Sequence, residues 1–346
     1  MIDPIRDFIE REGLLVLDGG LATELEALGC DLNDPLWSAR VLIDDPAVIR
    51  AAHRRFLEAG ADCIATSTYQ ATFEGFRARG LDAAATTRLL RDSVDLAISA
   101  RADFLAGRPA SPLGAPPPSN RAAPPTPAPR PVPPSSRPPS PSRPPPLVAA
   151  SVGPYGAYLA DGSEYRGDYG LSAPELYDFH ARRWEVLAET EADVLACETT
   201  PSVEEVRAYC RLAAVSRRPV WISFQCRDGA RLADGTPLET AAALCDAEPH
   251  VVAVGVNCVD PRLVVPLVRV ARRATEKPIL AYPNSGEEWD ADAKRWTGPA
   301  TPMDWARSAA EWRAAGADGV GGCCRVGPGE IAAVRAGAAS SQKTVT

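Results

Sequence analysis

The chain has 346 residues, of which 45% are hydrophobic, and it carries a formal net charge of −8 at pH 7. This length suffices for one large domain or two small ones with a sizeable core. The acidic balance argues against a nucleic-acid partner, because proteins that bind nucleic acid usually present a basic face.

The first residues do not have the pattern of a targeting segment. Asp3 and Asp7 lie where a signal peptide would have a basic region and then an apolar run. No apolar run elsewhere is long enough to span a bilayer. We therefore expect a cytoplasmic protein with no membrane partner.

Short apolar runs alternate with amphipathic stretches along most of the chain. Eight of these runs are predicted as strands buried on both faces of a parallel sheet: 14–18, 62–68, 147–152, 193–198, 220–224, 251–258, 279–282 and 319–323. Helical patterns separate them, with capping-box starts expected at Ser202 and Thr301 and a further helix start at Ser172. Eight strand–helix units predict a (β/α)₈ TIM barrel.

A doubly wound open sheet is the alternative fold. It is disfavoured because the segment after the first strand, Asp18-Gly19-Gly20-Leu21-Ala22-Thr23, lacks the glycine spacing of a dinucleotide-binding turn. In a barrel the active site lies at the carboxyl ends of the strands. Unusual polar residues occupy those positions: Asp18, Thr66, Thr68, Glu198, Asn257, Cys258, Asn284, Cys323 and Cys324.

Residues 107–146 differ in composition from the rest and are dominated by Pro, Ser, Ala and Arg. Such a stretch cannot build a helix, a sheet or a core. We expect a disordered insertion before the third strand, at the barrel face opposite the active site, that interrupts a single domain of residues 1–346. A docking segment for a proline-binding or acidic partner is the other interpretation. Residues 337–346 are expected to form a flexible tail.

The 9 cysteines and 3 histidines bear on metal binding. An odd number of cysteines without a secretion signal does not indicate a disulfide framework. Cys258 closes the sixth strand, and Cys323 and Cys324 close the eighth, so the three thiols can converge on one zinc ion. Three protein ligands with an open fourth position are typical of a catalytic zinc site.

Two other interpretations of this region remain open. Cysteines are often small buried packing residues, which is how we interpret the other six. Alternatively, Gly321-Gly322 and the helix start at Gly327-Pro328-Gly329 could cradle a phosphate. If zinc is bound, three thiolates give it a net negative charge, which suits deprotonation of a substrate thiol better than hydrolysis. The reaction this favours is alkyl transfer to sulfur.

Seven blocks in order carry a resemblance that covers almost the whole chain outside the insertion. They are Leu17-Asp18-Gly19-Gly20, residues 62–70, Ser151-Val152-Gly153-Pro154-Tyr155-Gly156, Cys197-Glu198-Thr199, Gly255-Val256-Asn257-Cys258, Tyr282-Pro283-Asn284-Ser285-Gly286 and Gly321-Gly322-Cys323-Cys324. With these blocks the chain resembles the homocysteine S-methyltransferase family. The Pro-rich insertion is a departure from the family pattern.

The resemblance implies a barrel that methylates L-homocysteine to methionine, with one Zn²⁺ held by Cys258, Cys323 and Cys324 and the substrate thiolate as fourth ligand. No further catalytic side chain is expected. The substrate-binding residues it implies are Asp18 and Glu198 for the ammonium group, the Gly19 N–H and Thr66 for the carboxylate, and Asn257. From the residues alone, Asp18 can instead form a turn, Glu198 can be a buried ion-pair partner, and Thr66 can serve strand packing.

The methyl donor is less defined. Residues 66–70 and 162–165 resemble the branch that uses the sulfonium donors S-methylmethionine or S-adenosylmethionine, and we favour the former. Trp37, Tyr155, Trp289 and Trp296 could offer aromatic faces to a sulfonium, although such residues more often serve core or rim packing. The alternatives are a betaine- or selenocysteine-type methyltransferase of the same family, a non-catalytic zinc or thiol redox protein, and a barrel enzyme for phosphorylated substrates.

Overall fold

The computed structural model describes residues 3–32, 38–108, 143–291, 293 and 295–340. Its main sheet has eight strands in the order β1-β10-β7-β6-β5-β4-β3-β2, and all neighbours are parallel. The parallel bridge Leu17↔Cys63 joins β1 to β2 and thus the two ends of the sheet. The predicted (β/α)₈ barrel is therefore confirmed, and an open doubly wound sheet is excluded.

The strands match the predicted segments to within a few residues. The barrel consists of β1 (Leu15–Val16), β2 (Cys63–Ala65), β3 (Leu147–Val152), β4 (Val194–Thr200), β5 (Val220–Phe224), β6 (Val251–Asn257), β7 (Ile279–Tyr282) and β10 (Gly319–Val320). A short antiparallel hairpin after β7, made of β8 (Glu288–Asp290) and β9 (Arg295–Thr297), was not predicted.

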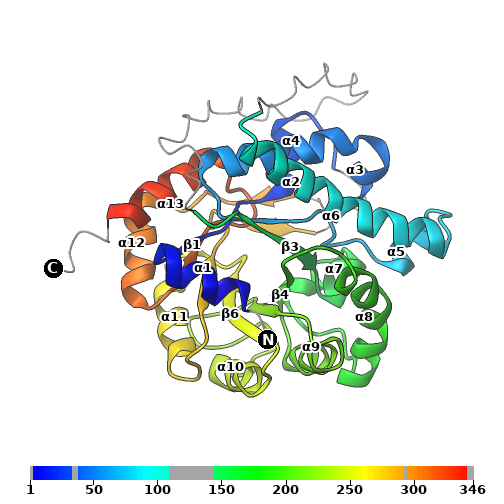
Figure 1. Cartoon of the computed structure of the whole chain (residues 1–346). Helices are drawn as coiled ribbons and strands as arrows, with labels where there is room; N and C mark the ends of the chain where they lie inside the picture. The colour runs from blue at the N-terminus through cyan, green and yellow to red at the C-terminus, as the bar shows by residue number, and fades with distance from the viewer. Residues whose placement is uncertain (1–2, 33–37, 109–142, 292, 294, 341–346) are drawn as a thin grey trace.

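Helices surround the strands, as Figure 1 shows. They are α1 (Pro4–Glu12), α2 (Leu21–Ala27), α3 (Ser38–Asp44), α4 (Pro46–Ala59), α5 (Phe73–Ala78), α6 (Ala83–Leu105), α7 (Tyr155–Leu159), α8 (Ala173–Ala188), α9 (Val203–Ser216), α10 (Leu238–Ala247), α11 (Val264–Arg272), α12 (Trp305–Ala315) and α13 (Pro328–Ser340), with 3₁₀ turns η1 (Ser163–Tyr165) and η2 (Pro261–Leu263). None of the described helices is both long and apolar enough to cross a membrane.

Helix α1 lies across the barrel (Figure 1) and closes the end at which the strands begin. Asp3 caps it by accepting a hydrogen bond of 2.9 Å from the Arg6 N–H, and Gly13 ends it in the left-handed conformation. Its buried Ile5 and Phe8 pack with side chains inside the barrel, among them Trp221. The site must therefore open at the other end, where the strands finish.

Two of these three predicted helix starts are found. Ser172 forms a complete capping box, and the Ser202 hydroxyl accepts a bond from the Glu205 N–H. The expectation at Thr301 is wrong, because the Thr301 N–H is bonded to the Ser285 carbonyl at 2.8 Å instead. Helix α12 consequently begins at Trp305, with Asp304 as its cap.

The tail begins later than expected. Helix α13 continues through Ser340, and a Cβ at Gly337 would lie 1.9 Å from the carbonyl oxygen of Ala306 in α12. Residues 337–340 are therefore helical rather than a flexible tail, and Gly337 packs against α12. Residues 341–346 lie outside the described residues.

Most of the expected Pro-rich insertion of residues 107–146, namely residues 109–142, also lies outside the described residues. Its flanks lie at the end of the barrel that α1 closes. Arg143 pairs with Glu12 of α1 at 3.0 Å and with Asp62, a buried acid just before β2. This end is opposite the carboxyl ends of the strands, as we predicted for the insertion.

Replacing residues 109–142 by a short Gly-Ser linker is expected to leave turnover close to that of the full chain, because the flanks lie away from the strand ends. The same replacement combined with Arg143→Ala should lower the free energy of unfolding by roughly 1–3 kcal/mol, since Asp62 loses one of its charged partners. Steady-state rates and urea unfolding measure the two effects. Loss of turnover in a folded linker variant would contradict this placement.

Candidate functional site

Three cysteine thiols meet at the carboxyl ends of the strands. The sulfur atoms of Cys258, Cys323 and Cys324 all lie within 4.8 Å of one another, and Cys258 Sγ is 3.5 Å from Cys324 Sγ. All nine cysteines are free thiols, and no other group of metal-ligating side chains forms among the described residues. The sequence thus identified the three thiols that the fold brings together.

Strand β7 lies between the strands that carry these cysteines and aligns them. The Cys258 N–H donates to the Tyr282 carbonyl at 3.3 Å, and the Cys323 N–H donates to the Pro283 carbonyl at 2.8 Å. Cys258 also has a φ of +50°, a left-handed backbone that few non-glycine residues adopt. Such strain is typical of functional sites, because the surrounding fold holds the residue where chemistry needs it.

The donor set fits a zinc ion. Hydrogen bonds from Cys323 and Cys324 hold the pKa of Cys258 well below that of an ordinary thiol. The amide nitrogen of Asn257 lies 3.8 Å from Cys323 Sγ, as a residue that orients a ligand would. Among the described residues, no Arg or Lys is bonded to any of the three thiols, so a bound cation would supply the missing positive charge.

Two carboxyl groups lie near the thiols. Asp18 is 7% exposed, and its Oδ2 accepts a bond of 2.8 Å from the Ala65 N–H. Glu198, at the end of β4, accepts a bond of 2.6 Å from the Ser151 hydroxyl. Burial raises the pKa of Asp18 well above its usual range, with the Glu198 charge adding to the effect, and burial raises the pKa of Glu198 to about 7. Neither acid is ion-paired within the described chain, so both can receive a ligand cation.

The remaining expected substrate-binding residues have mixed surroundings. No described residue accepts a hydrogen bond from the Gly19 amide, which is therefore available to a ligand. The Thr66 hydroxyl lies 2.7 Å from Thr68 Oγ1 and accepts from the Ser151 N–H at 3.0 Å. Asn257 bonds the backbone and the hydroxyl of Thr199 at 2.8 and 2.9 Å. Thr66 thus bonds the neighbouring strand β3, whereas Asn257 reaches past β5 to bond β4. The contact of either residue with substrate stays a prediction.

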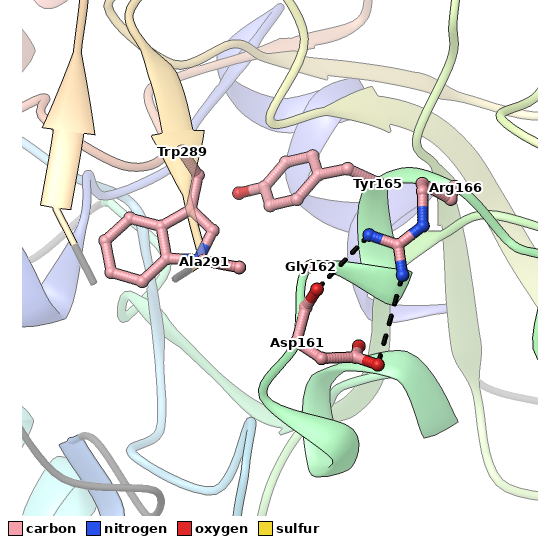
Figure 2. Close-up of a pocket in the computed structure, with 6 residues that line it drawn as sticks. All are labelled: Asp161, Gly162, Tyr165, Arg166, Trp289 and Ala291. Carbon is pink, nitrogen blue, oxygen red and sulfur yellow. Dashed lines mark hydrogen bonds and ion pairs between the residues drawn. The ribbon is translucent and has the colours of Figure 1, made fainter. Parts of the chain in front are cut away.

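A cavity of about 440 Å³ is lined by Asp161, Gly162, Tyr165, Arg166, Trp289 and Ala291 (Figure 2). Tyr165 connects it to the cluster, because its hydroxyl lies 3.9 Å from Cys258 Sγ. In Figure 2 the Tyr165 ring and the Trp289 indole face the same space, while Arg166 turns to Asp161. The cavity is thus open to an organic ligand next to the thiols.

Several residues of the site were not predicted as such. Glu164 precedes Tyr165, and burial raises its pKa to about 7. Tyr69 lies near Glu164 and Cys258, whose charges add to the rise that burial causes in its pKa. Thr199 has a φ of +59° directly after Glu198. The signal for each was its place in a resembling block, residues 162–165, 62–70 and 197–199, but no role was assigned.

The four aromatic residues considered for the methyl donor lie in different places. Trp289 lines the cavity, and Trp296 pairs with it across the β8–β9 hairpin at 5.4 Å between ring centroids. Tyr155 instead packs against Phe179 at 4.8 Å. Trp37 lies outside the described residues.

The phosphate interpretation of the same region finds no support. Glu330 Oε2 accepts a hydrogen bond of 3.0 Å from the Gly327 N–H at the start of α13. The N–H that a phosphate would need is therefore already bonded to a carboxylate, whose charge would repel an anion.

A TIM barrel with three thiols that could hold a metal ion, and with two unpaired acids at its strand ends, is the arrangement of a metal-thiolate enzyme site. Comparison with known proteins gives the family. The sequence profile described as Homocysteine S-methyltransferase matches residues 15–338, and the chain belongs to this family of methyltransferases.

Individual relatives agree over nearly their full lengths. The chain is 42% identical to homocysteine S-methyltransferase YbgG of Bacillus subtilis, covering 99% of this chain and 100% of that one. It is 41% identical to a selenocysteine Se-methyltransferase of Brassica oleracea, covering 94% and 89%. The metallated form of the homocysteine methyltransferase MmuM from Escherichia coli superimposes with a TM-score of 0.78 at 41% identity, covering 96% and 99%. The predicted family, fold and enzyme class are confirmed.

Proposed function

We propose that the chain transfers a methyl group from a sulfonium donor, S-methylmethionine in the first place, to the thiol of L-homocysteine. The observation that carries this is the juxtaposition of three thiols, two carboxyl groups and an aromatic cavity at one end of the barrel. Cys258, Cys323 and Cys324 would hold one zinc ion, which supplies a lowered pKa for the homocysteine thiol at neutral pH.

Each end of homocysteine has a counterpart in the site. Asp18 and Glu198 can hold its ammonium group, because ionised carboxylates make strong hydrogen bonds to a cation. The Gly19 N–H can bind its carboxylate. The barrel then fixes the sulfur near the thiols, so that catalysis rests on positioning rather than on a protein base.

The cavity suits the methyl donor. The rings of Tyr165 and Trp289 can offer their faces to a sulfonium, and Asp161 pairs with the Arg166 cation at the rim. The homocysteine sulfur attacks the methyl carbon, the bond from that carbon to the sulfonium breaks, and a neutral sulfide leaves. The donor is therefore positively charged when it binds, and its sulfur becomes neutral when the methyl group is transferred.

An assay with three donors tests the proposal. Purified protein should form methionine from homocysteine with S-methylmethionine faster than with S-adenosylmethionine, and with betaine it should form little. Bound zinc should be close to one per chain in the same samples. Zinc-free protein that still turned over would contradict the metal assignment, and zinc-loaded protein without turnover on any donor would favour a non-catalytic zinc protein.

Selenocysteine is a second acceptor to include, because one relative at 41% identity is a selenocysteine Se-methyltransferase. A higher rate with selenocysteine than with homocysteine would reassign the acceptor without changing the site. We also propose a cytoplasmic location, since a reducing compartment keeps nine cysteines as thiols.

A further inference from the structure

A buried carboxylate outside the thiol site collects three hydrogen bonds from different parts of the chain. Glu205, on α9, is 0% exposed. Its Oε1 accepts from the Tyr155 N–H at 2.7 Å and faces His180 Nε2 at 2.8 Å, and its Oε2 accepts from the Tyr169 hydroxyl. A charge placed in the interior is costly unless such donors surround it, so this arrangement serves a purpose beyond packing.

The protonation state of this network follows from its geometry. The Arg183 guanidinium donates to His180 Nδ1 at 2.7 Å, so the ring proton lies on Nε2 and is donated to Glu205. Burial, together with the Arg183 charge, lowers the pKa of His180 to about 4. A neutral imidazole thus links Arg183 to Glu205 and keeps the carboxylate oriented.

Two of the three bonds fall at opposite ends of one segment. Tyr155 begins α7, and Tyr169 lies in the loop before α8. Between them is η1, which carries Glu164 and Tyr165. Helix α7 touches η1 closely, because a Cβ at Gly156 would lie only 2.4 Å from the Glu164 nitrogen.

The tip of this segment is the part that reaches the thiols. Tyr165 contacts Cys258 at 3.9 Å, and it lines the cavity with Asp161, Gly162 and Arg166, which belong to the same segment. Four of the six lining residues therefore come from residues 155–169. The shape of the cavity depends on where the two ends of that segment are held.

We propose that Glu205 is a positioning residue for the methyl donor: it fixes both ends of residues 155–169 and so sets the donor cavity at the correct distance from the thiols. The expected effect on the donor KM rests on the proposed function, whereas the anchoring of residues 155–169 does not. Glu205 itself touches neither the cavity nor the thiols, so it acts through the segment.

Two variants and one control test this role. Tyr169→Phe removes the tie at the far end and leaves the Tyr155 and His180 bonds in place. Glu205→Gln removes the charge while keeping one acceptor oxygen. Glu204→Gln is the matched control, because Glu204 is the adjacent acid on α9 but bonds the Ala173 N–H at the start of α8 instead.

Tyr169→Phe is expected to raise KM for S-methylmethionine about ten-fold, the effect of one charge-assisted hydrogen bond, and Glu205→Gln at least as much. KM for homocysteine and the zinc content should stay close to those of the parent protein. Glu204→Gln should behave like the parent in all three measurements.

Hydrogen exchange gives a readout that does not need turnover. Amides of residues 155–169 should exchange faster in both test variants than in the control. If faster exchange left the donor KM unchanged, or if zinc content and both KM values changed together, the positioning role would be refuted. Should Glu205→Gln fail to fold, Tyr169→Phe decides alone. A parent protein inactive on all sulfonium donors would instead refute the proposed function, while the exchange rates would still report on the anchor.

Discussion

Replacing Cys258 by alanine is expected to remove bound zinc and, with it, methyl transfer. The substitution leaves two thiols, and it deletes the residue that the fold holds at a φ of +50° and 3.5 Å from Cys324 Sγ. Replacing a residue that only orients a metal ligand lowers metal affinity or activity by about 10–100-fold. Loss of a direct ligand should therefore lower metal affinity by at least about 100-fold. Zinc per chain and initial rates in the same samples measure the effect.

Two further variants make this a graded test. Asn257→Ala keeps all three thiols but removes the amide 3.8 Å from Cys323 Sγ. Its zinc content and initial rate should lie between those of the parent and of Cys258→Ala. Cys226→Ala removes a thiol that is 3% exposed but lies outside the cluster, and it should keep its zinc. Full activity in Cys258→Ala, or equal zinc loss in Cys226→Ala, would disprove the assignment of the metal ligands.

The barrel was predictable because its strands have a simple local signature. Strands β3, β5 and β7 coincide with the predicted segments, since runs of apolar residues buried on both faces begin and end abruptly. The last strand is shorter than expected. The Gly321 N–H still bonds the Ala281 carbonyl of β7 at 3.0 Å, but the Gly322 N–H bonds the Asp18 carbonyl at 3.0 Å instead, a long-range contact that no local pattern shows.

The thiols and acids of the site were predictable for a different reason. Reactive residue types at the ends of parallel strands converge whatever the details of packing. Tyr165 was not predictable in this way, because it lies in a 3₁₀ turn between helices and is separated from Cys258 by 93 residues. Its position depends on how the segment that carries it is anchored, and the anchor at Glu205 is itself a tertiary feature. Sequence alone therefore predicts the acceptor side of the site better than the donor side.

Replacing Glu198 by glutamine is expected to abolish most activity and yet stabilise the ligand-free protein above neutral pH. The activity should fall because the substrate ammonium loses a carboxylate partner, whose charge-assisted hydrogen bond is worth roughly 10–100-fold in kcat/KM. Most of this loss should show as a higher KM for homocysteine. The zinc content should stay unchanged, since Glu198 is not one of the proposed metal ligands.

The stability gain follows from the pKa of Glu198. Burial raises that pKa from 4.5 to about 7, so the folded protein retains a proton between these values that the unfolded chain has released. The free energy of unfolding therefore falls as pH rises from about 4.5 to about 7 and stays low above that. Glutamine has no charge to bury, so the variant should exceed the parent by up to roughly 3 kcal/mol at pH 8, because each unit of pKa corresponds to about 1.36 kcal/mol.

This sign of the pH dependence separates a binding role from a packing role. The difference between variant and parent should shrink towards zero as the pH falls through about 4.5, because below that value Glu198 is protonated in both the folded and the unfolded state. Urea unfolding at pH 5 and pH 8 measures it, with Glu189→Gln as the control, because Glu189 pairs with Arg91 on the surface. A carboxylate retained only for structure would make glutamine destabilising at both pH values. A carboxylate kept for a ligand cation lowers the free energy of unfolding of the ligand-free protein, because its charge has no partner. Binding of the substrate ammonium supplies that partner and stabilises the folded state.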